Sequence, residues 1–179
     1  MKVFLISPKH IDKLSIAKEV VALDDNINIC KRFTSNIEDK NELSNFRFFM
    51  DVDDTILAFK NNVLLYLEYR DDNVSGITLD DYEASDIILI DSNHFNEIPD
   101  IYLANKELLF ITLYSKTNKN DETKKQDIIE DQYIQDRSLE LNIPIIYFID
   151  EAATDIANII IDYIKGDEEI RERIIQENS

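Results

Sequence analysis

Near its start the sequence reads KVFLIS at residues 2–7, then PKHI, then DKLSIAKEVVAL at residues 12–23, and this stretch is the clearest indication of the fold class. The first segment is a short apolar run of the kind that a buried strand shows. The second segment places Leu14, Ala17 and Val20 on one face of a helix. Because an apolar strand that leads into an amphipathic helix is typical of parallel sheets, we expect a β-α unit here.

The alternation of apolar runs and amphipathic segments continues along the chain. Further strands are expected at 26–32, 86–91, 108–114 and 144–149, and helices at 79–84, 126–141, 151–165 and 167–179. Residues 116–125 have no hydrophobic anchor and predict a loop. Gly166 is a good C-cap residue for the helix that precedes it. The pattern predicts an α/β fold with a parallel sheet and helices on both of its faces.

The middle of the chain departs from this alternation. An aromatic segment at 46–49 is followed by a short helix-like segment at 53–61 and an alternating strand at 63–70. This block predicts a small β-rich insertion instead of another β-α unit. With 179 residues the chain has the length of one domain. We therefore expect a core of residues 1–33 and 79–179 that carries an insertion at 34–78.

The charge of the chain excludes several classes of function. There are 19 basic and 37 acidic residues, which give a formal net charge of -18. Such a surface repels phosphate backbones and anionic lipid headgroups, so we expect neither nucleic-acid nor membrane binding. Cys30, His10 and His94 are too few and too far apart for a disulfide or a zinc site. The apolar start is too short for a signal peptide, and the sequence predicts a cytoplasmic protein.

The turn after the first strand lies where phosphate-binding loops occur. Residues 7–15, SPKHIDKLS, match G-x-x-x-x-G-K-[ST] only through Lys13, the candidate catalytic lysine. Ser7 and Asp12 replace the two glycines, and Leu14 replaces the hydroxyl that holds magnesium. Since backbone amides must curl around phosphates, these changes oppose nucleotide binding. The alternative is an ordinary β-α turn in which Asp12 caps the helix.

Residues 34–91 contain a series of features in a recognisable order. A segment that starts with Thr34 and reaches Glu42 is followed by the aromatic strand, the short acidic helix, a strand that carries Glu68 and the sequence NVSGIT at 73–78. This order resembles guanylate kinases, in which the same features, with NVSGIT as a turn, form the GMP-binding insertion. The resemblance implies a P-loop-kinase-like fold, a three-layer parallel sheet flanked by helices.

The resemblance also implies a set of nucleotide-binding residues. These are Thr34, Ser35, Glu42, Glu68, Ser75, Thr78 and Asp91. Asn36 and Asp39 stand where the family has two phosphate-binding arginines, and Ser75 stands where it has a tyrosine. Arg32 and Arg137 remain as possible cations, and Arg137 is the second catalytic candidate or else a solvated helix residue. Because phosphoryl transfer needs cations, the resemblance implies a fold whose catalytic residues are largely lost.

A competing motif lies in FFMDVDDTI at residues 48–56. An apolar strand followed by D-x-D-x-T resembles haloacid-dehalogenase-type phosphatases, which would make Asp51 the nucleophile and Asp53 the general acid/base. Further candidates for that family's motifs are Thr112, Ser115, Lys125, Asp150 and Asp155. The alternative is that Asp51 or Asp53 caps the short helix that follows.

Two classes of function remain open. The first is a non-catalytic protein that binds another protein or a nucleotide and needs no cofactor or metal; a protein partner would present a basic patch. The second is an active nucleoside-monophosphate kinase, which alone would need ATP and magnesium. For the acidic side chains Asp121, Glu122, Glu130 and Asp131, we expect a solvated acidic face.

Overall fold

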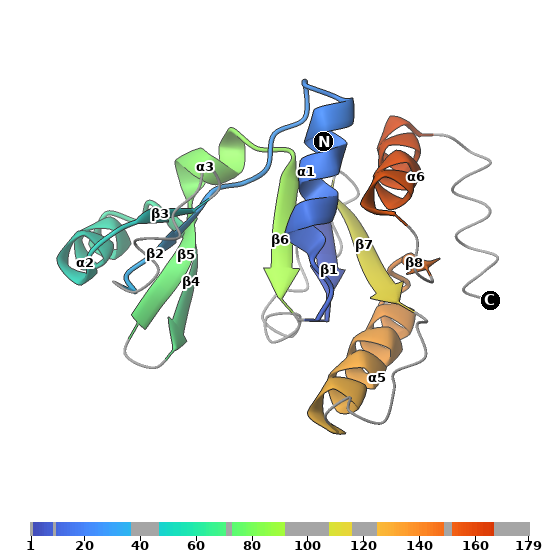
Figure 1. Ribbon diagram of the computed structural model, residues 1–179. Coiled ribbons are helices and arrows are strands. Elements are labelled where there is room, and N and C mark those ends of the chain that lie inside the picture. Colours follow the sequence, from blue (N-terminus) through green and yellow to red (C-terminus); the bar gives the residue numbers. More distant parts are fainter. Residues whose placement is uncertain are drawn as a thin grey trace. The chain divides into compact units, whose positions relative to one another are not determined.

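The computed structural model describes residues 2–8, 10–36, 47–70, 73–91, 108–115, 125–148 and 152–166. The chain forms two compact units. The first unit comprises Met1–Ile27 and Ile87–Ser179, and the second comprises Asn28–Asp86. Each unit contains its own four-stranded sheet (Figure 1). The predicted insertion, residues 34–78, lies within the second unit.

The sheet of the first unit is parallel throughout and has the order β6-β1-β7-β8. Its strands are β1 (Lys2–Ser7), β6 (Ile87–Asp91), β7 (Leu108–Ser115) and β8 (Ile145–Phe148). The central strand β1 is buried from Val3 to Ser7. A strand covered on both faces explains why its sequence is a continuous apolar run without alternation. All four strands were predicted, with differences of one or two residues at their ends.

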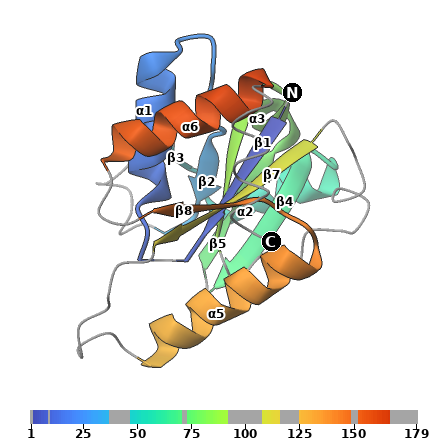
Figure 2. The ribbon, with the colours of Figure 1, turned by 90° about the vertical axis from the view of Figure 1, so that its right-hand side faces the viewer.

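Three helices cover this sheet on both faces. They are α1 (Lys13–Leu23), α5 (Lys125–Glu140) and α6 (Ala153–Lys165). Helices α1 and α6 pack against each other on one face, and α5 contacts β7 on the other (Figure 2). Ile16 and Val20 of α1 and Ile156 and Ile160 of α6 are buried. The predicted three-layer α/β arrangement is confirmed.

The ends of these helices follow local sequence signals. Helix α5 ends at Glu140, and just beyond it Asn142 has a φ of 53° while the N–H of Ile143 donates to the carbonyl of Ser138 at 2.8 Å. This is a Schellman motif with asparagine in the left-handed position. Helix α6 ends at Gly166, which has a φ of 83°, as predicted.

A surface ion pair joins the carboxyl ends of α1 and α6. The Nζ of Lys165 lies 3.1 Å from a carboxylate oxygen of Asp24. Hydrogen bonds from Asn26, and then the one from Lys165, lower the pKa of Asp24. Because Asp24 lies near the surface, this pair aligns the two helix ends and adds little to stability.

The sheet of the second unit has the order β3-β2-β5-β4. Its strands are β2 (Arg32–Thr34), β3 (Arg47–Phe49), β4 (Leu64–Arg70) and β5 (Asn73–Thr78), and its helices are α2 (Val52–Lys60) and α3 (Leu79–Glu83). Strand β2 is parallel to β3 and antiparallel to β5, which is antiparallel to β4. The side chain of Phe33 is fully buried, with its ring centroid 6.2 Å from that of Phe48.

Two predictions for this unit are wrong. Residues 26–31 do not form the strand that was expected at 26–32. Strand β2 begins at Arg32 and belongs to the second sheet. Ile27, Ile29 and Cys30 are buried, but Asn28 pairs with Asp86 through its N–H and its carbonyl. The turn expected at 73–78 is strand β5, because these residues pair with both β2 and β4.

The other segments predicted for the middle of the chain are confirmed. The aromatic segment forms β3, the short acidic segment forms α2, and the alternating segment forms β4. Residues 116–124 of the loop predicted at 116–125 and the predicted helix at 167–179 lie outside the described residues, whereas Lys125 is the first residue of α5. No helix within the described ranges combines the length and apolar character that a membrane span requires.

Candidate functional site

The loop between β1 and α1 uses its own backbone amides. The N–H of Ile11 donates to the carbonyl of Pro8 at 3.1 Å, and the N–H of Lys13 donates to the carbonyl of Ile11 at 2.8 Å. Proline has no N–H to offer at position 8. A phosphate-binding loop points successive amides outward at an anion. Here, the amides of Ile11 and Lys13 already donate hydrogen bonds to carbonyls of the loop.

Asp12 occupies the amino-terminal end of α1. Its carboxylate accepts a hydrogen bond from the N–H of Ser15 at 3.0 Å, as the capping interpretation predicts. This end of a helix carries a partial positive charge that attracts anions. A phosphate at this position would therefore compete with a covalently attached carboxylate. Lys13 follows as the first residue of α1 and is half-buried.

A second carboxylate reaches the same loop from α5. The side chain of Asp131 is 6% exposed, and one of its oxygens lies 3.5 Å from Nδ1 of His10. The expectation that Asp131 belongs to a solvated acidic face is therefore wrong. A spacing of i, i+3, i+7 places Asp131, Ile134 and Ser138 on one face of the helix, and all three are buried. This spacing was the signal in the sequence that Asp131 faces inward.

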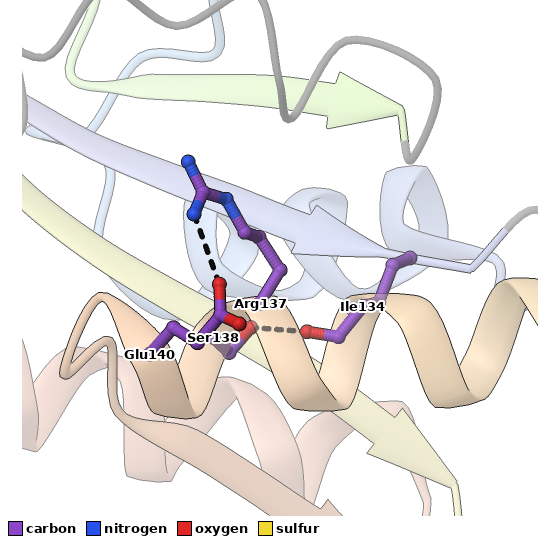
Figure 3. Close-up of polar contacts among 4 residues, drawn as sticks. All are labelled: Ile134, Arg137, Ser138 and Glu140. Atoms are coloured by element: carbon purple, nitrogen blue, oxygen red, sulfur yellow. Dashed lines mark hydrogen bonds and ion pairs between the residues drawn. The ribbon is translucent and has the colours of Figure 1, made fainter.

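Arg137 interacts with its own helix. Its Nη1 donates to the carboxylate of Glu140 at 3.0 Å, and its side chain is 32% exposed (Figure 3). The Nε atom is buried and makes no hydrogen bond within the described part of the chain. Glu140 thus neutralises the candidate phosphoryl-binding arginine at short range.

The neighbouring Ser138 is a structural residue. Its hydroxyl lies 2.7 Å from the carbonyl of Ile134 (Figure 3) and 2.7 Å from Oγ1 of Thr112 on β7. Ser138 and Thr112 are fully buried. This hydrogen bond fixes α5 to the sheet, so Thr112 is not available as the small hydroxyl of a phosphatase site.

In the second unit, three predicted nucleotide-binding residues lie in one row of the sheet. Thr34 of β2 is the register partner of Ser75 of β5, which is the register partner of Glu68 of β4. The row continues to Phe49 of β3. Thr34 and Glu68, which are 34 positions apart in the sequence, are thus brought into one row by their pairing with Ser75.

Other predicted binding residues make local hydrogen bonds. The hydroxyl of Thr34 accepts from the N–H of Asn36 at 3.1 Å, and that of Ser35 accepts from the N–H of Val74 at 2.7 Å. Thr78 caps α3 and donates to the carboxylate of Asp81 at 2.6 Å. These contacts hold strands and helix ends in place.

The remaining predicted residues are placed by the backbone or not described. Asp91 ends β6 and is the register partner of Ser7, so the two residues meet at the carboxyl edge of the first sheet. Ligands of open α/β sheets bind outside this edge. Glu42 lies outside the described residues.

The competing phosphatase motif has a structural explanation. Asp51 is the N-cap of α2, and its carboxylate accepts from the N–H of Asp54 at 2.7 Å. Asp53 is exposed in the first turn, where an acidic side chain complements the helix dipole. Ser115 ends β7, Lys125 begins α5, and Asp155 is exposed in the first turn of α6. Asp150 lies outside the described residues.

Comparisons with known proteins agree with the topology. No model of a known protein family matches the chain, and no curated protein matches it. Among solved structures, a guanylate kinase from Anaplasma phagocytophilum matches with a TM-score of 0.53 and 12% sequence identity, over 93% of this chain and 86% of that one. The chain has a guanylate-kinase-like fold. The predicted resemblance is confirmed at the level of the fold, including its P-loop-kinase-like sheet.

Within this guanylate-kinase-like fold, the predicted residues fall into two groups. Lys13, Arg137 and Asp91 belong to the first unit, whereas Thr34 and Ser75 belong with Glu68 to the second. The described residues include no group of three or more His, Cys, Asp or Glu placed to hold a metal ion. The first unit places Asp12 and Asp131 at the loop between β1 and α1, and the strand register of the second unit aligns Thr34, Ser75 and Glu68 in one row.

Proposed function

We propose that the chain is a binding protein that uses a guanylate-kinase-like fold without transferring phosphate. The observation that carries this proposal is the hydrogen bond from the N–H of Ser15 to the carboxylate of Asp12. It occupies the helix end at which a P-loop kinase would hold phosphate. The committed amides of Ile11 and Lys13 support the same conclusion.

The charges around the loop point the same way. Phosphoryl transfer depends on positioning and on cations that neutralise the transferred group. The carboxylates of Asp12 and Asp131 lie on or against the loop instead, and Arg137 is paired with Glu140. We infer that the protein works without a cofactor. An active nucleoside-monophosphate kinase is the second candidate, favoured by the row of Thr34, Ser75 and Glu68.

Nucleotide addition tests this proposal. We expect the thermal unfolding midpoint to stay unchanged with ATP, GMP and magnesium, because the amides of Ile11, Lys13 and Ser15 already donate to acceptors within the loop. A ligand at 100 times its dissociation constant would add about 2.7 kcal/mol to the free energy of unfolding. A magnesium-dependent increase that disappears in Lys13→Ala would support the kinase instead.

The acidic surface indicates the chemistry of the partner. A formal charge of -18 attracts basic surfaces and repels phosphate backbones. We therefore propose that the partner is a protein with a basic patch. Steering by long-range charge acts mainly on association and is screened over about 8 Å at physiological ionic strength.

Salt dependence tests the basic partner. A pull-down from lysate at low salt should recover a partner that is released when the salt concentration is raised, because screening weakens the attraction. Recovery only of partners whose binding is indifferent to salt would contradict the proposal. The charge would then serve solubility alone.

A further inference from the structure

A pair of ionisable side chains joins the β1–α1 loop to helix α5. The Nδ1 atom of His10, in the loop, lies 3.5 Å from a carboxylate oxygen of Asp131, on the helix. The side chain of Asp131 is 6% exposed, whereas that of His10 is 33% exposed. Both residues belong to the first unit, although they are far apart in the sequence. A buried acid therefore lies against a base that can exchange protons with solvent.

The acid of this pair lies on the inner face of its helix. Asp131 shares that face with Ile134 and Ser138, which are fully buried. The hydroxyl of Ser138 lies 2.7 Å from Oγ1 of Thr112 on β7, which fastens this face to the sheet. The carboxylate of Asp131 therefore has a fixed position in the first unit.

The loop that carries His10 is held within itself by short-range hydrogen bonds. The N–H of Ile11 donates to the carbonyl of Pro8, and the N–H of Lys13 donates to the carbonyl of Ile11. Both bonds join residues of the loop and do not reach α5. The contact of His10 with Asp131 thus adds a connection between the loop and a helix that lies elsewhere in the fold.

The length of the contact indicates an attraction between charges. An N–H···O hydrogen bond usually spans about 2.7–3.2 Å, which is shorter than this pair. Imidazole is a cation only when both of its nitrogens are protonated. A carboxylate that is removed from water is stabilised by an opposite charge beside it. The contact should therefore be strong when His10 is protonated and weak when it is neutral.

We propose that His10 and Asp131 form a pH-sensitive latch, which holds the β1–α1 loop to α5 while the imidazole is protonated and releases it when the proton is lost. The proton then acts as a ligand that favours the held state of the loop over the released state. Protonation of histidine is an established way to switch a contact of this kind. The latch regulates the loop and requires neither a nucleotide nor a protein partner.

The sign of the pH dependence follows from linkage. The negative charge of Asp131 favours the protonated imidazole in the held state, and this advantage is absent once the loop is released. The held state therefore binds the proton more tightly than the released state does. Its extra stability is fully present at low pH and is lost as the pH rises and His10 deprotonates.

The other charged groups around the pair are not histidines. They are Lys9, Asp12 and Lys13 along the chain from the loop into α1, Asp91 at the end of β6, and Asp127, Glu130 and Arg137 on α5. Carboxylate, lysine and arginine side chains ordinarily keep their charge between about pH 5.5 and 8, the range in which histidine changes its own. They add a constant background, against which the titration of His10 is measured.

NMR titration of the imidazole of His10 in the full chain tests the proposal. The sequence has two histidines, and His94→Gln removes the second signal. We expect Asp131→Asn to lower the titration midpoint of His10 by about one pH unit, the lower end of the effect of a nearby opposite charge, because part of the imidazole is exposed. One pH unit is a tenfold change in proton affinity.

Asp136→Asn is the matched control for this titration. It makes the same chemical change on the same helix, but Asp136 is exposed and bonds to Gln132 at 2.8 Å. Its substitution should leave the midpoint of His10 nearly unchanged. A midpoint that Asp131→Asn does not lower, or that both variants lower equally, would overturn the proposal.

Hydrogen exchange of the loop amides tests the release itself and does not depend on the folding of Asp131→Asn. At about pH 5.5, His10→Gln should reduce the protection of the Ile11 and Lys13 amides about tenfold relative to the wild-type chain, and at about pH 8 the two proteins should be alike. Equal protection at the lower pH, or an equal loss at both, would show that His10 is no latch. Since no nucleotide or partner is added, these results leave the proposed function to its own tests.

Discussion

Replacing Phe33 by alanine is expected to lower the free energy of unfolding by about 3–5 kcal/mol, the usual range for a fully buried phenylalanine. The side chain of Phe33 has no exposed surface and lies at the centre of β2. It faces Phe48 on β3 and is the register partner of Gly76 on β5. The loss combines the transfer of apolar surface to water with the cavity that remains.

The measurement is denaturant unfolding, with Phe59→Ala as the matched control. Phe59 belongs to the same unit and undergoes the same chemical change, but it is 64% exposed. Its substitution should change the free energy of unfolding of the monomer by less than about 0.5 kcal/mol. Equal losses for the two variants would contradict the packing described for the second unit.

Ser138→Ala is expected to lower the free energy of unfolding by about 1–3 kcal/mol, because it leaves a buried hydroxyl without an acceptor. The hydroxyl of Ser138 has one proton, which it donates to the carbonyl of Ile134 at 2.7 Å. Thr112 must then be the donor in the 2.7 Å contact between Thr112 and Ser138. Removal of the serine oxygen leaves the hydroxyl of Thr112 without an acceptor in the core between α5 and β7.

A double-mutant cycle tests this direction of donation. Thr112→Val removes the hydroxyl that Ser138→Ala leaves without an acceptor, while it keeps the shape of the side chain. The double variant should therefore be more stable than the sum of the two single losses predicts. Strictly additive losses, measured by denaturant unfolding, would show that the two hydroxyls do not depend on each other.

Local signals predicted most of the first unit. The run KVFLIS is apolar without alternation because both faces of β1 are covered, and that pattern is visible in sequence. Asp12 and Gly166 lie at helix ends where their side chain or their positive φ is needed. Each of these features depends on a few neighbouring residues. The sequence therefore contains enough information to place them.

The wrong predictions involve long-range pairing. Ile27, Ile29 and Cys30 are buried, as an alternating pattern indicates, yet burial does not show that a segment joins a strand ladder. The partner of Asn28 is Asp86, which lies 58 residues away. Residues 73–78 contain turn-forming types, but pairing with β2 and β4 makes them a strand. Tertiary contacts override local preference in such segments.

The candidate site was predicted in part. The capping roles of Asp12 and Asp51 follow from their position before a helix, and the structure confirms both. The burial of Asp131 was missed because it lies between the polar residues Glu130 and Gln132, although its spacing from Ile134 and Ser138 indicates an inward face. The contact between Asp131 and His10 joins α5 to a distant loop. Helical periodicity alone does not identify such a partner.

Because Cys30 is buried, its reaction with a thiol reagent can report on the opening of the second unit. Cys30 is the only cysteine of the chain, and its side chain is 4% exposed. A thiol reagent can reach the sulfur only during an opening of the structure around it. Under native conditions, the rate of labelling therefore measures how often this unit opens, without any substitution. Comparing that rate with the rate of global unfolding would reveal whether the two units open together or one at a time.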